Sequence, residues 1–108
     1  MTRSDFIIYS LPVEFIQAAM HDERHIWEEF KRGEKYALSY IYSQYVNQLF
    51  SYGKKFTSDD ELVKDTIQDL YFDIIRTRES LGSTHNIYFY LLKSFRRKLF
   101  RSVETSKK

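Results

Sequence analysis

Helical periodicity, broken at only a few places, is the sequence feature that most limits how this chain can fold. Its 108 residues include three glycines and one proline, so few positions favour tight turns or hairpins. Between these positions, apolar residues recur every three or four places, as they do on one face of an α-helix. A chain of this length forms one domain with its own core. We therefore expect an all-α fold, a compact bundle of three main helices plus one or two short N-terminal helices.

The three main helices are expected at residues 34–56, from segment 57–61 to about residue 78, and after Asn86. Segment 57–61 offers hydroxyl and carboxylate groups that can cap a helix N-terminus, and Asn86 can do the same. The side chains expected to face inward are aliphatic or aromatic: Leu38, Ile41, Tyr45, Leu49, Tyr52, Phe56, Val63, Ile67, Leu70, Ile74, Tyr88, Leu91, Leu92, Phe95 and Leu99.

The domain itself is expected to span residues 24–103. It opens with a short helix over residues 24–32, which Gly33 ends. Residues 1–23 form an N-terminal extension that we expect to be partly helical, since Pro12 can open a helix. Residues 104–108 are expected to be a disordered tail.

Several classes of function are disfavoured by what the sequence lacks. With no cysteine there is no disulfide or thiolate metal site, which fits a reducing compartment such as the cytoplasm. We identify no signal peptide and no membrane span in the sequence. His21 and His25 have a spacing that suits a metal, but no third ligand with matching spacing is evident. We expect a monomer that is not an enzyme, needs no cofactor or metal, and does not insert into membranes.

Charge is segregated along the second half of the chain. Residues 57–75 contain six carboxylates and one lysine, whereas residues 87–108 contain seven basic residues and one glutamate. Such polarity in a small domain favours two different partners, one basic and one anionic. The alternative is that the two stretches face each other within the fold.

One face of the second long helix has an apolar residue that the core does not explain. Phe72 falls within about 60° of Asp65, Asp69 and Arg76, opposite the buried stripe, and Gln68 lies at the edge of the same face. An aromatic side chain ringed by polar groups is typical of a binding hot spot. The alternative is that Phe72 packs beneath residues 1–23.

The outward face of the third helix mixes cations with aromatic rings. Its members are Phe89, Tyr90, Lys93, Arg96, Arg97, Phe100 and Arg101. Cations follow phosphates and aromatic rings stack on unpaired bases, so this mixture favours single-stranded or opening DNA over an intact major groove. The alternative is that the rings pack on a neighbouring helix and the charges are merely solvated.

Three segments of the sequence resemble region 2 of the extracytoplasmic-function sigma factors of bacterial RNA polymerase. Residues 30–38, with Ile41-Tyr42 and Leu49-Phe50, look like its opening. Residues 62–72 resemble the acidic Asp-x-x-Gln-(Asp/Glu)-x-Phe stretch, and residues 87–101 resemble the segment that opens and reads the promoter minus-ten element. The resemblance covers about residues 26–103.

The resemblance implies partners and roles. The acidic stretch would bind the coiled coil of the polymerase β′ subunit, through Asp65, Gln68, Asp69 and Phe72, with help from Arg76. Loop 82–86 would capture a flipped-out promoter base with Ser83, Thr84, His85 and Asn86. Phe89 and Tyr90 would receive unstacked bases of the melted minus-ten region, and the cations of the third helix would hold its phosphates. An anti-sigma protein is a further implied partner.

The sequence also departs from the family pattern. A family Trp is replaced by Tyr90, an Asn by Arg97 and an Asp by Arg101, changes that put the base preference in doubt and increase attraction to phosphate. In the family, a linker and a helix-turn-helix domain follow this region, so the chain is either an excised piece or a single-domain relative. Two other functions stay open: a helical protein-interaction module of the same fold without promoter binding, and a basic protein that binds duplex DNA.

Overall fold

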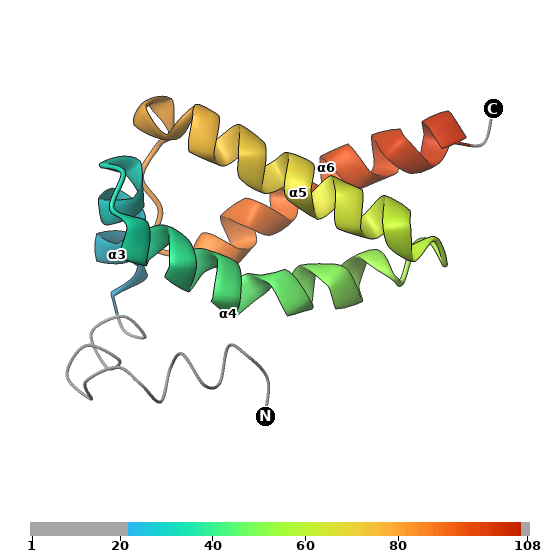
Figure 1. Ribbon diagram of the computed structural model, residues 1–108, viewed down its shortest axis with the longest axis horizontal. Coiled ribbons are helices and arrows are strands. Elements are labelled where there is room, and N and C mark those ends of the chain that lie inside the picture. Colours follow the sequence, from blue (N-terminus) through green and yellow to red (C-terminus); the bar gives the residue numbers. More distant parts are fainter. Residues whose placement is uncertain (1–21, 107–108) are drawn as a thin grey trace.

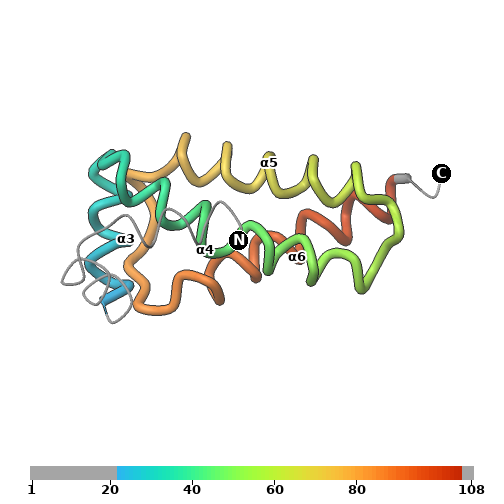
Figure 2. The backbone as a smooth tube through the Cα atoms, turned by 60° about the horizontal axis from the view of Figure 1, so that its bottom comes forward, coloured from blue at the N-terminus to red at the C-terminus, as the bar shows by residue number. Residues whose placement is uncertain are grey.

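The computed structural model describes residues 22–106, and it confirms the expected all-α bundle (Figure 1). Its elements are α3 (Glu23–Lys31), α4 (Lys35–Gly53), α5 (Asp60–Arg76), the 3₁₀ helix η1 (Arg78–Ser80) and α6 (Ile87–Ser106). The three long helices pack on one another, and α3 lies across one end, where it meets α4, η1 and α6. The connection between α5 and α6 closes this same end of the bundle (Figure 2). The helix suggested near Pro12 lies outside the described residues, as does His21.

Side chains cap three of the helices at their starts. The carboxylates of Asp22 and Asp59 accept hydrogen bonds from the amides of His25 (3.0 Å) and Leu62 (3.1 Å), and the Asn86 side chain accepts one from Phe89 (2.9 Å). Gly33 follows α3 with a φ of +91°, a left-handed conformation that glycine adopts without strain. These local signals explain why the helix starts lie close to their predicted positions.

The helix ends deviate more from the predictions. Helix α4 ends at Gly53 and α5 at Arg76, whereas α6 continues to Ser106, beyond residue 103 where we expected the domain to end. The Thr105 hydroxyl donates a hydrogen bond to the Arg101 carbonyl (2.9 Å), and Val103 packs partly against the core. Val103 therefore attaches the C-terminal part of α6 to the core.

The core combines side chains from all four α-helices. Its fully buried members include Trp27, Phe30, Ile41, Leu49, Val63, Leu70, Ile87, Leu91, Phe95 and Leu99. The prediction that Phe56 faces inward is wrong: the residue follows the end of α4, and 42% of its surface is exposed. The ring of Phe56 packs edge-on against Tyr52 and Phe100 instead.

Gly53 sits where three helices approach closely. A Cβ atom at this position would lie 2.8 Å from Cγ1 of Val63 on α5 and 3.1 Å from Cζ of Phe95 on α6. Both distances are shorter than ordinary carbon contacts of 3.5–4.0 Å. The glycine thus costs helix propensity in α4 but permits dense packing in the core.

Candidate protein and nucleic-acid interfaces

The outer face of α5 presents Phe72 among polar groups, as the sequence predicts. Phe72 has 64% of its surface exposed, and Asp65, Gln68 and Asp69 are also exposed. These four residues line an open groove of about 520 Å³, which Leu62, Thr66 and Ser102 complete. The alternative that residues 1–23 cover Phe72 concerns mainly residues 1–21, which lie outside the described part of the chain.

The residue at the aromatic position of the acidic pattern is not the exposed Phe72. In Asp65-x-x-Gln68-Asp69-x-Phe, the seventh place falls on Tyr71, which is buried and whose ring lies tilted against that of Tyr42, with 5.1 Å between the centroids. Its hydroxyl donates to the Ile41 carbonyl (3.2 Å), and burial raises its pKa. Tyr71 therefore joins α5 to α4, and Phe72 is the ring available to a partner.

Arg76 is not among the residues that line the groove beside Phe72. Its guanidinium forms an ion pair with Asp73 (3.1 Å), and it lines a second groove, of about 460 Å³, between α5 and α6. Arg97 and Arg101 line this second groove as well. Arg76 therefore lines the same groove as Arg97 and Arg101, two cations for which the sequence predicts DNA binding.

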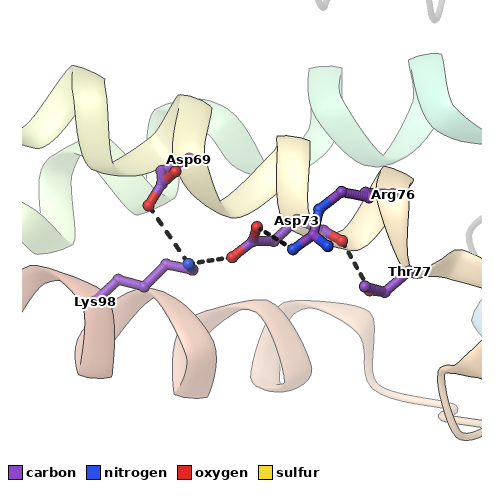
Figure 3. Close-up of polar contacts among 5 residues, drawn as sticks. All are labelled: Asp69, Asp73, Arg76, Thr77 and Lys98. Atoms are coloured by element: carbon purple, nitrogen blue, oxygen red, sulfur yellow. Dashed lines mark hydrogen bonds and ion pairs between the residues drawn. The ribbon is translucent and has the colours of Figure 1, made fainter.

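Lys98 joins the acidic helix to the basic one (Figure 3). Its ammonium group lies 3.4 Å from the Asp69 carboxylate and forms a shorter ion pair with Asp73. The contact with Lys98, and secondarily that with Arg76, lowers the pKa of Asp73, while the contact with Asp73 raises the pKa of Lys98. The alternative that the charged stretches face each other thus holds at this contact. Lys98 has no predicted role, because the charge pattern along the sequence does not show which cation of α6 faces α5.

A cavity of about 300 Å³ lies between loop 81–86 and the start of α6. Thr84, Phe89, Tyr90, Lys93 and Arg97 line it together with Ser94. Phe89 has 62% of its surface exposed, whereas Tyr90 is half-buried, with its ring centroid 4.8 Å from that of Trp27. Five residues that the sequence analysis proposed for DNA binding therefore surround one cavity, and Tyr90 supports the fold as well.

Helix α3 holds the loop beside this cavity. The Trp27 indole N–H donates to the Gly82 carbonyl (2.7 Å), and the Ser83 hydroxyl donates to the Glu28 carboxylate (3.0 Å). The backbone amide of Asn86 donates to the Thr84 hydroxyl (3.1 Å). Because these contacts position the loop, Trp27 and Glu28 contribute indirectly to the candidate site. This role was not predicted, since Trp27 and Glu28 each contact a residue 55 positions further along the chain.

The remaining predicted DNA-binding residues do not line this cavity. The guanidinium carbon of Arg96 lies 5.1 Å from the ring centroid of Phe100, a cation–π contact. His85 and Ser83 are exposed on the loop, and the side-chain oxygen of Asn86 caps α6. The predicted DNA-binding residues therefore fall into four groups: the cavity, the exposed loop with the cap of α6, an aromatic cluster near Phe56, and the groove between α5 and α6.

Neither a metal centre nor a membrane span is found in the described part of the chain. Within residues 22–106, histidines and carboxylates nowhere gather in threes as potential metal ligands. In the same residues, the helices are too short or too polar to cross a bilayer. Comparisons with protein-family models, with curated proteins and with solved structures find no match for this chain.

Proposed function

We propose that this protein is a transcription initiation module that binds the β′ coiled coil of core RNA polymerase and recognises the melted promoter minus-ten element. The proposal rests on the resemblance of residues 26–103 to sigma region 2. The observation that supports it most is the exposed Phe72 ring beside Asp65, Gln68 and Asp69 in one groove. The exposed Phe72 ring is not part of the buried core.

The groove suits a basic helical partner. Burial of the Phe72 ring against an apolar side chain supplies affinity, because aromatic residues dominate the energetics of most interfaces. Asp65 and Asp69 then pair with lysine or arginine side chains of the coiled coil, which favours this partner over acidic ones. Gln68 can both donate and accept hydrogen bonds at the rim.

The cavity beside loop 81–86 suits an unstacked base and its phosphates. Phe89 offers an exposed ring for stacking, a contact worth roughly 1–3 kcal/mol per base. Lys93 and Arg97 line the same cavity and can pair with the flanking phosphates. Neutralising four phosphates of a single strand would give log K a slope of roughly −3 against log salt concentration.

A pull-down with the isolated β′ coiled coil tests the protein half of the proposal. Native protein should be retained, while Phe72→Ala and Asp69→Lys should be lost. Phe89→Ala is the matched control, because Phe89 is equally exposed but lies on α6 away from the groove. Retention of both α5 variants at the native level would contradict polymerase binding and favour the protein-interaction module without transcription activity.

Binding to single-stranded and double-stranded promoter DNA of equal length tests the nucleic-acid half. The proposal predicts a clear preference for the non-template single strand, because the rings near the cavity stack only on unpaired bases. Phe89→Ala should reduce this preference while Phe72→Ala leaves it unchanged. Equal affinity for both forms would instead identify a basic protein that binds duplex DNA.

A further inference from the structure

We infer that the groove between α5 and α6 is a second site for nucleic-acid phosphates, in which Arg76 of α5 acts together with Arg97 and Arg101 of α6. This inference rests on the proposed function and deepens it. It also moves Arg76 from the polymerase-binding face, where the sequence analysis placed it, to the DNA-binding surface.

The charge of the groove favours an anion. Its described lining includes the cations Arg76, Arg97, Lys98 and Arg101 and one carboxylate, Asp73. Asp73 is already engaged by both Lys98 and Arg76. The C-terminal carbonyls of α5 contribute about half a negative charge here, which the cations outweigh.

Two of these cations have no carboxylate partner. Neither Arg97 nor Arg101 forms an ion pair among residues 22–106, and both side chains are exposed. Arg76 uses one terminal nitrogen for Asp73 (3.1 Å), so other N–H groups of its guanidinium can donate to a phosphate.

The groove continues the path of a strand from the base-binding cavity. Arg97 and Tyr90 line both, together with Ser94, so the two hollows share one border. A strand whose base enters the cavity near Thr84 can therefore place its next phosphates beside Arg97, Arg101 and Arg76. The cations of the cavity and of the groove therefore lie along one path that a single strand can follow.

The test measures binding of a fluorescently labelled single-stranded DNA pool of randomised sequence, about 12 nucleotides long, at several salt concentrations. Arg76→Ala should weaken binding about ten-fold at low salt, the effect of one lost charge-assisted hydrogen bond. The slope of log K against log salt should become shallower by about 0.7, the value for one phosphate of a single strand. Arg76→Lys should retain most of the slope.

Arg32→Ala is the matched control. Arg32 forms an ion pair at 3.2 Å with Glu29, three residues before it, just as Arg76 does with Asp73 at 3.1 Å. The two arginine side chains are also similarly exposed, at 64% and 61%. Arg32 lines neither the groove nor the cavity, so its loss should leave DNA binding unchanged.

The outcomes separate this inference from the proposed function. If native protein binds the pool but Arg76→Ala matches it in affinity and slope, the groove is not a phosphate site, while the proposed function stands. If Arg76→Ala loses the β′ coiled coil and keeps DNA, Arg76 belongs to the polymerase face and the inference is overturned. If native protein binds no single strand, the nucleic-acid half of the proposed function fails together with the inference.

Discussion

Lys98 is the residue where the two oppositely charged helices meet. Its ion pairs with Asp73 and Asp69 raise its own pKa and lower that of Asp73, so both charged forms stabilise the fold. Because the pKa of Asp73 in the folded state lies below its ordinary value of 3.8, the stability it contributes is present above that pH and is lost in stronger acid. The contribution of Lys98 is present below its ordinary pKa of 10.5 and is lost in stronger base.

Lys98→Met should therefore lower the free energy of unfolding by up to about 1 kcal/mol at neutral pH, the upper end for partly exposed pairs. The difference from native protein should shrink as the pH falls through the depressed pKa of Asp73. Urea unfolding at neutral and acidic pH measures it. Lys64→Met is the control, because Lys64 and Glu61 form an exposed pair at 3.6 Å. A difference that persists unchanged in acid would contradict this role for the pair.

Trp27 is the residue that attaches the loop to the core. Trp27→Phe removes the hydrogen bond to the Gly82 carbonyl and part of the buried indole volume. We expect a loss of about 1 kcal/mol for the hydrogen bond, with a further loss from the cavity. Hydrogen exchange at residues 82–86 should accelerate more than exchange within α5. Equal acceleration in both segments would show that the variant destabilises the whole domain without loosening the loop in particular.

At the scale of elements, the contact of α4 with α5 and α6 depends on Gly53. Gly53→Ala should destabilise the protein although alanine favours helix by about 1 kcal/mol, because its Cβ would overlap Val63 and Phe95. The expected net loss is about 1–2 kcal/mol by urea unfolding. Gly82→Ala is the control, since a Cβ there meets no atom within 4 Å. Val63→Ala in the Gly53→Ala background should cost less than Val63→Ala alone; equal costs would contradict the packing explanation.

The sequence predicts those features of an element that neighbouring residues determine, and not those that depend on packing between helices. Capping by Asp59 and Asn86 and the left-handed turn at Gly33 follow from residues next to one another, and they lie where the sequence predicts. The exposure of Phe56 and the burial of Gly53 depend on how three helices pack together. The periodicity of a single helix does not determine this packing.

The candidate sites show the same division. The exposure of Phe72 follows from its angle on a single helix, and the structure confirms it. The grouping of Thr84, Phe89 and Arg97 around one cavity also agrees with their closeness in the sequence. The placement of Arg76 near Arg101, and of Trp27 beneath the loop, required the packing of separate elements.

At the scale of the whole molecule, the bundle has two separate hollows that the proposed function assigns to different partners. The Phe72 groove lies on α5 and reaches α6 only at Ser102, whereas the cavity lies at the loop end, beside Thr84 and Phe89. The two hollows share no described lining residue, so the proposed function predicts that a protein and a nucleic acid bind at the same time. Lys98, which contacts Asp69 on one side and lines the α5–α6 groove on the other, lies between them.

The most direct test of this account is fluorescence anisotropy of a labelled non-template minus-ten strand titrated first with the protein and then with the β′ coiled coil. If the two surfaces are separate, the anisotropy should rise once as the strand binds and again as the larger ternary complex forms. With Phe72→Ala the first rise should remain and the second should disappear. Displacement of the strand by the coiled coil, or a second rise that Phe72→Ala leaves intact, would contradict the assignment of two separate binding surfaces.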